Sequence, residues 1–155
     1  MKLFWAGHPE GPASALRRTN RAPPMREHAA MVQSYRVAGG LVNSDRAAAL
    51  LGRYREQPIS QLARWIVGRR VVSFEWEGER LIPLFQFDLS DMSPHQRVTQ
   101  VLCELVDAFD DDLQVAAWFT RPSCWLRWAQ PLAMFESDYA EVLGAARADR
   151  FLARG

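Results

Sequence analysis

SPHQRVTQVLCELVDAF, residues 93–109, is the stretch that decides the fold of this chain. Its apolar side chains recur at the three- and four-residue intervals of one helix face, and Ser93-Pro94 favours a helix start. The acidic run Asp110–Asp112 follows at once and separates this segment from the next apolar one. The pattern predicts an amphipathic helix, whose inward face comprises Val98, Val101, Leu102, Leu105, Val106 and Phe109.

The chain downstream of this helix is helical in pattern as well. Residues 113–119 predict a short apolar helix, and Pro131 opens another that runs through Phe135. Asp138 favours the cap of a final helix. We therefore expect residues 93–155 to form a small helical domain. One face of its last helix comprises Tyr139, Val142, Leu143, Ala146 and Arg150.

Two further helices are expected upstream, within residues 41–88. Ser44-Asp45 favours an N-cap for a short helix that Gly52 ends. Pro58 suits the first turn of a second helix, which runs to residue 67. The apolar spacing predicts that its inward face comprises Ile59, Leu62, Ala63 and Ile66.

A β-hairpin is expected directly after these helices. Residues 71–76 are rich in β-branched and aromatic side chains, and a second short strand is expected over 80–84 after a glycine-containing turn. Pro83 predicts an edge strand, because proline cannot donate to a ladder. The fold class we predict is mainly α, with a helix-turn-helix-like module and one β-hairpin over 41–88, followed by the helical domain over 93–155.

Residues 1–40 differ from the rest of the chain in composition. They contain four of the nine prolines, and their six basic and two acidic side chains give a net charge of +4. The remaining residues carry a net charge of −3. We expect a basic, flexible N-terminal arm over 1–40, in which residues 25–36 form at most a marginal helix.

Composition argues against several classes of function. The chain has 155 residues and only two cysteines, without metal-ligand or disulfide spacing, and no apolar run of membrane-spanning length. We expect a soluble, cytoplasmic protein that does not associate with membranes. No nucleophile–base pair, phosphate loop or histidine cluster is recognisable, so we expect no enzyme activity, no catalytic residues, no cofactor and no metal.

Two groups of motifs carry a resemblance to a known family. The first is WFTRPSCWL at 118–126, followed by AQPLAMF at 129–135 and a closing helix to Gly155. The second is LVNSDRAAALLG at 41–52 with RLIPLFQF at 80–87. In this order they resemble Xre/MbcA/ParS-type antitoxins, whose C-terminal domain binds a toxin. The chain departs from the family at 127–129, where Arg-Trp-Ala stands in place of the usual glycines.

The resemblance implies a non-enzymatic role opposite a RES-domain toxin, an enzyme that degrades NAD. It implies a homodimeric antitoxin whose C-terminal segment blocks the cleft of the toxin. A guanidinium is permanently charged and suits a cleft that holds phosphates. Complementation of the dipole of the last helix is the plainer interpretation of the same arginines. The toxin-binding candidates are Arg147, Arg150, Arg154, Gly155 and Trp128.

Binding to promoter DNA is the second expectation that the resemblance raises. Polar side chains on and after the predicted helix 58–67 can bond to base edges or phosphates. The candidates are Ser60, Gln61, Arg64, Arg69 and Arg70. A solvated helix face, on a module retained only for dimer packing, is the favoured interpretation, and the net negative charge of residues 41–155 disfavours DNA. The alternative function is a stand-alone DNA-binding transcriptional regulator whose C-terminal domain only dimerises.

Overall fold

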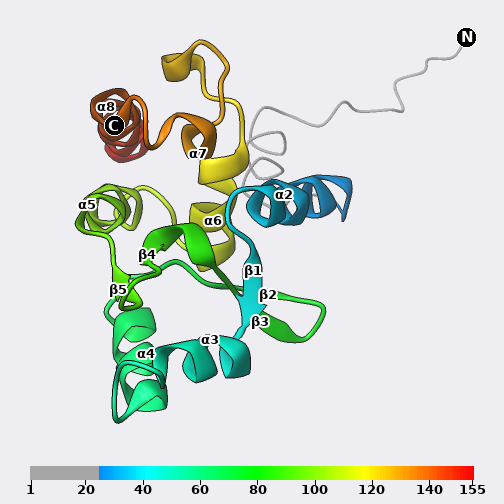
Figure 1. Ribbon diagram of the computed structural model, residues 1–155. Helices are drawn as coiled ribbons and strands as arrows, with labels where there is room; N and C mark the ends of the chain where they lie inside the picture. Colours follow the sequence, from blue (N-terminus) through cyan, green and yellow to red (C-terminus); the bar gives the residue numbers. More distant parts are fainter. Residues whose placement is uncertain (1–24) are drawn as a thin grey trace, which may run out of the picture.

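A computed structural model describes residues 25–155 of the chain. This part is mainly helical and contains a three-stranded antiparallel sheet. Figure 1 shows the sheet between two groups of helices: α2 and α5 to α8 lie on one side, and α3 and α4 lie on the other. The prediction of a mainly α protein is confirmed, and the sheet has one more strand, β1, than the single hairpin that was predicted.

Helix α2, Met25–Val37, corrects the prediction of a flexible arm over residues 1–40. Met31, Val32 and Tyr35 of this helix are buried in the main core, and α2 packs against α6. The Tyr35 hydroxyl donates a hydrogen bond of 2.5 Å to the carbonyl oxygen of Ala116, and burial raises the pKa of this phenol well above its usual value. The helix expected over 25–36 is therefore present, but it is not marginal, because three of its large side chains are buried in the core. The flexible arm predicted for residues 25–40 is wrong, since the basic, proline-rich composition outweighed these apolar side chains in the prediction. Residues 1–24 lie outside the described part.

The sheet consists of β1 (Leu41–Asn43), β2 (Phe74–Trp76) and β3 (Glu79–Pro83), in the order β1-β3-β2. The predicted hairpin is confirmed. The prediction that Pro83 marks an edge strand is wrong, because β1 pairs with β3 and makes it the central strand. Proline is tolerated there because Pro83 is the last residue of β3, and β2 extends only to Phe74, opposite Leu81.

A buried glutamine continues the sheet beyond the end of β2. Gln86, which has no solvent exposure, follows the short helical turn Leu84–Gln86. Its side-chain oxygen accepts from the Val72 amide at 2.7 Å, and its side-chain nitrogen donates to the carbonyl oxygens of Val72 at 2.8 Å and Pro83 at 2.9 Å. The amide therefore takes the place of a ladder partner for backbone groups that would otherwise be buried without one.

The two helices on the other side of the sheet are α3 (Ser44–Leu51) and α4 (Pro58–Val67), and both were predicted. The N-cap of α3 is Asn43, one residue before the predicted pair, and its side chain accepts from the amide of Arg46. The inward face of α4 also differs from the prediction. Leu62 and Trp65 are buried, and both Ile59 and Ala63 are exposed.

The C-terminal helices are α5 (Gln96–Leu105), α6 (Asp112–Thr120), α7 (Pro131–Met134) and α8 (Tyr139–Arg154). A 3-10 turn, η2 (Cys124–Leu126), lies between α6 and α7. The helix predicted from residue 93 begins later, because Ser93–Pro94 forms strand β5, which pairs with β4, Phe87–Asp88. The aspartate run acts as expected: Asp111 caps α6 by accepting from the Gln114 amide.

Two apolar cores share the sheet. The larger core joins α2, α5, α6, α7 and α8 to one side of the sheet, where Phe74 is buried. The smaller core joins α3 and α4 to the other side, where Ile82 has no exposure. Side chains alternate across a strand, so one short sheet supplies both cores. The N-terminal module and the helical part are thereby packed as neighbours on one sheet.

Candidate functional site

Large hydrophobic side chains that are exposed gather in three regions of the described surface. Exposed apolar clusters, unlike scattered single residues, mark candidate interaction sites. The first region comprises the end of α8 and η2 with the bend after it, the second lies on and beside α4, and the third adjoins a groove lined by residues 84–89 and by the starts of α5 and α7. The first region contains Trp125, Trp128, Phe151 and Leu152. The second contains Tyr54, Ile59 and Val67, and the third contains Val37 and Leu89.

The bend that follows η2 holds Trp128 outward. Arg127 has a φ of 55° and Trp128 a φ of 68°, so two consecutive residues with side chains adopt the left-handed region. Ser123 closes the bend: its carbonyl oxygen accepts from the amide of Trp128 at 2.8 Å, and its amide donates to the carbonyl oxygen of Ala129 at 3.0 Å. Trp128 is 71% exposed. Glycine adopts this backbone at no steric cost, and residues with a Cβ do not.

One carboxylate joins this bend to α8. Asp149 accepts the indole N–H of Trp118 at 2.7 Å with one oxygen and the indole N–H of Trp125 at 2.9 Å with the other. Trp118 belongs to α6 and is buried, whereas Trp125 belongs to η2 and is half exposed. Asp149 thus fixes the position of η2, and of the bend after it, relative to α8.

The predicted toxin-binding arginines lie together on the side of α8 that faces α5. Arg147 and Arg150 pair with Glu104 at 3.3 and 2.6 Å, and Arg150 also pairs with Asp107 at 3.0 Å. Arg154 pairs with Asp107 at 2.8 Å. The hydrogen bond from Arg150, followed by that from Arg147, lowers the pKa of Glu104, although its burial acts in the opposite direction. These arginines therefore tie α8 to α5 within the chain.

The last turn of α8 extends past this network. Residues 151–155 are all exposed, and Phe151 is 76% exposed. A shallow cavity of about 440 Å³ lies at this end of the helix. Its lining comprises Glu104, Arg147, Arg150, Phe151, Arg154 and Gly155. Four of the five predicted toxin-binding residues thus meet at one cavity, and Trp128 lies apart from it, on the bend.

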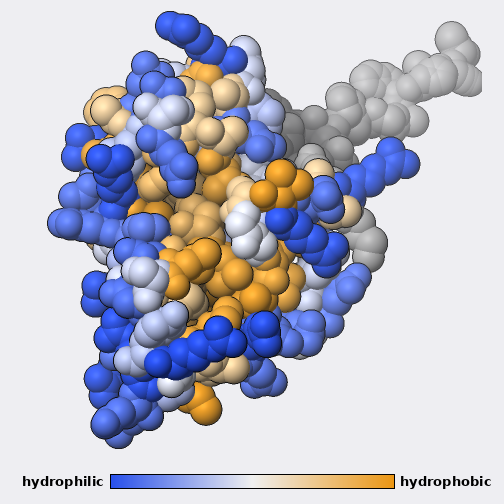
Figure 2. Space-filling view, in the orientation of Figure 1, coloured by the Kyte–Doolittle hydropathy of each residue, from blue (hydrophilic) through white to orange (hydrophobic). Residues whose placement is uncertain are grey.

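A larger groove, of about 1040 Å³, lies between residues 84–89, the start of α5 and α7. Figure 2 shows apolar side chains across the middle of this face of the molecule. Phe85 and Phe135 line the groove with their ring centroids 6.0 Å apart, and Asp88, Arg97 and Glu136 supply charges of both signs around it. The sequence analysis did not single out this groove, because its residues come from four segments that are distant along the chain.

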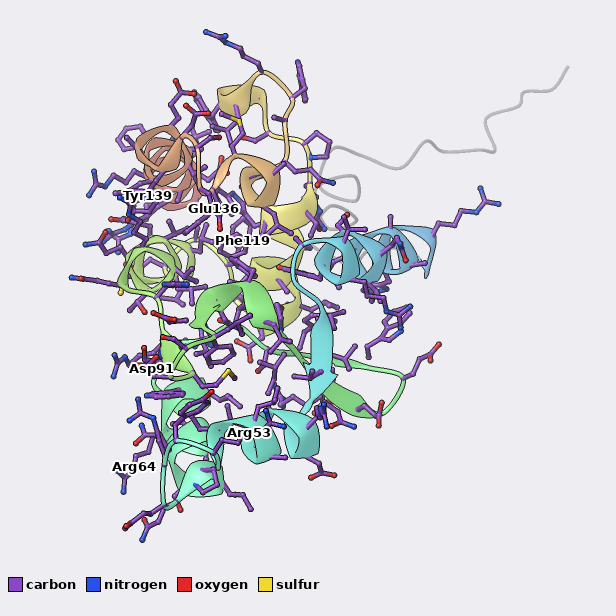
Figure 3. The ribbon with its side chains drawn as sticks, viewed as in Figure 1. Arg53, Arg64, Asp91, Phe119, Glu136 and Tyr139 are labelled. Carbon is purple, nitrogen blue, oxygen red and sulfur yellow. The ribbon has the colours of Figure 1, made fainter. Side chains whose placement is uncertain are left out.

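The predicted DNA-binding residues lie at the other end of the molecule. Ser60, Arg64, Arg69 and Arg70 are exposed, and Gln61 is half-buried. Figure 3 shows Arg64 on the outer side of α4. The helix therefore presents these side chains to solvent, but it presents Ile59 and Val67 there as well.

Sequence reasoning missed Asp149, Phe151 and Leu152. The spacing of Asp149 and Leu152 on the final helix places them on one side, but nothing local links them to Trp125. Within residues 25–155, no group of three or more His, Cys, Asp or Glu side chains is arranged to hold a metal ion. No helix of that part is long and apolar enough to cross a membrane. Comparisons of the chain with known protein families, with curated proteins and with solved structures found no match.

Proposed function

We propose that this chain is the cytoplasmic antitoxin of a toxin–antitoxin pair and that it binds a RES-domain toxin. The binding surface we propose is the end of α8 together with the bend at 127–129. The resemblance of residues 95–155 to Xre/MbcA/ParS-type antitoxins names the partner. The exposed apolar side chains Trp125 and Trp128 on η2 and the bend, and Phe151 and Leu152 at the end of α8, support the location.

The observation that carries the proposal is the conformation of Trp128. A tryptophan with a φ of 68° is strained by roughly 1 kcal/mol, and its side chain is 71% exposed, so the fold gains little from burying it. Residues that keep a strained backbone conformation in the folded protein are found preferentially at functional sites. Tryptophan is also among the residue types that are enriched where a few side chains dominate a protein interface.

The arginines have a positioning role in this proposal. Glu104 and Asp107 hold Arg150, and α8 is thereby held against α5 with its last turn projecting. Arg154 is half exposed, so its guanidinium keeps donors for an acceptor on the partner. Occlusion of the toxin cleft by Phe151, Leu152 and the chain end is then steric, with a cationic contribution from Arg154.

Co-expression with the RES-domain protein of the neighbouring reading frame tests the proposal. The wild-type chain should restore growth and cellular NAD, and Trp128→Ala should weaken both. Removal of residues 151–155 should abolish rescue, because it removes the projecting turn that would enter the toxin cleft. The truncated chain should still fold, because Arg150 and its ion pairs with Glu104 and Asp107 remain. Tyr54→Ala, an exposed aromatic near α4, is the matched control and should rescue fully. Failure of the wild-type chain to rescue, or full rescue by the truncated chain, contradicts the proposal.

The alternative function is a DNA-binding regulator, and the order of elements favours it. Helix, strand, helix, helix and hairpin, from α2 to β3, is the order of a winged helix-turn-helix module. The hairpin that would serve as the wing carries Glu75, Glu77 and Glu79, which repel phosphate. Binding of DNA that falls steeply with salt, and that Arg64→Ala weakens, would support this alternative.

A further inference from the structure

The larger groove is lined mainly by apolar side chains and has apolar side chains at its edge. Leu89 lines it and is 61% exposed, and Val37, next to the groove residue Ala38, is 78% exposed. The volume of about 1040 Å³ is comparable to that of pockets that enclose a drug-sized ligand. An exposed apolar surface of this kind marks a site for a partner. The other apolar side chains of the lining are Leu84, Phe85, Phe87, Leu132 and Phe135.

Two glycines after α2 bring the backbone close to the segment that supplies Phe85. Gly39 and Gly40 have φ values of 103° and 104°, which residues with a Cβ rarely adopt. The carbonyl oxygen of Gly40 accepts from the Leu84 amide at 2.9 Å, and a Cβ at Gly39 would lie 3.6 Å from the amide nitrogen of Phe85. The backbone therefore holds Phe85 beside the end of α2, where it lines the groove.

The charged side chains of the groove leave two carboxylates open to a ligand. Arg97 is engaged within the chain, because its guanidinium lies over the Tyr139 ring at 4.9 Å. Asp88 accepts the amide of Ser90 at 2.9 Å and its hydroxyl at 2.7 Å on one oxygen, Oδ1. The other oxygen, Oδ2, has no hydrogen-bond donor among residues 25–155. The carboxylate of Glu136, after α7, has no hydrogen bond or ion pair with any residue that the structure describes (Figure 3).

We propose that this groove binds a peptide segment of another protein, in which a large apolar side chain is adjacent to lysine or arginine. The apolar side chain contacts Phe85 and Leu89, and the basic one pairs with Glu136. An apolar centre with a polar rim is the usual composition of a protein interface. Nucleic acid suits the groove less well, because the open carboxylates repel phosphate. The groove shares no residue with the surface proposed for the toxin, so the two proposals stand or fall separately.

Selection of short random peptides displayed on phage, against the immobilised full chain, tests the proposal. Peptides with Phe, Leu or Trp next to Lys or Arg should be enriched, and synthetic copies should bind in fluorescence anisotropy. Leu89→Ser and Glu136→Arg should each weaken this binding several-fold. Ile59→Ser and Glu56→Arg make the same substitutions at exposed residues outside the groove, so they are the matched controls and should bind as the wild type does. Circular dichroism melting should show that all four variants are folded.

The charge reversal also tests what the groove selects. Selection against Glu136→Arg should enrich Asp or Glu where the wild type enriches Lys or Arg, because the preferred charge follows residue 136. No enrichment, an unchanged preference, or equal binding by Leu89→Ser overturns the proposal.

Two other occupants of the groove would give different results. Residues 2–5 of this chain, Lys-Leu-Phe-Trp, have the same chemistry as the proposed ligand. If peptides bind only after Phe4 and Trp5 are replaced by alanine, the groove takes a segment of its own chain and the proposal is wrong. If Leu89→Ser instead converts a dimer to a monomer in sedimentation equilibrium, a second copy is the occupant, and the proposal fails as well.

Discussion

Arg127→Gly should stabilise the protein, although it removes a large side chain. Arg127 has a φ of 55° and is exposed. The left-handed conformation costs a residue with a Cβ roughly 1–2 kcal/mol. Glycine avoids this cost but loses about 0.5–1 kcal/mol more backbone entropy on folding. The free energy of unfolding should therefore rise by about 0.5–1 kcal/mol. For a chain of this length, that corresponds to roughly 1–4 °C in Tm.

Two control variants separate backbone strain from the loss of the side chain. Arg127→Ala keeps the Cβ and should not stabilise the fold. Arg121→Gly makes the same substitution at an exposed residue with a φ of −86°, so it should lower the free energy of unfolding by about 0.5–1 kcal/mol. Urea unfolding of the three variants beside the wild type measures these differences. Equal effects of Arg127→Gly and Arg127→Ala would refute the strain argument.

Three further perturbations probe the interior contacts. Gln86→Leu should destabilise the fold by roughly 2–4 kcal/mol in urea unfolding, because it leaves three buried backbone groups without partners. Asp149→Ala should lower the free energy of unfolding by about 1–3 kcal/mol and shift the tryptophan emission, because two indole N–H groups lose their acceptor. The pairing with Arg150 lowers the pKa of Glu104 below 4.5, so its contribution to stability should be complete above that pH and decline as pH falls through the lower, folded-state pKa. Glu104→Gln should flatten this decline in melts recorded between about pH 6 and 3, and an unchanged pH profile would count against the pairing.

Local patterns predicted the helices and the hairpin, because their causes lie within a few residues of chain. Pro58 begins α4 and residue 67 ends it, as expected, and Asp111 caps α6. Which face of a helix is buried depends on its neighbours, and that was predicted less well. Ile59 fits the apolar spacing of α4, but Trp65 faces the sheet and packs near Phe87 instead.

The candidate site depends on contacts between distant parts of the chain. Arg150 and Glu104 are 46 residues apart, so no spacing rule could pair them, and dipole complementation alone could not name the carboxylate. The bend at 127–129 is the one part of the candidate site that the sequence analysis did single out. The resemblance placed glycines where this chain has Arg127 and Trp128, and those residues have left-handed backbone. Two of the positions where the chain differs from the pattern that it resembles thus have left-handed backbone.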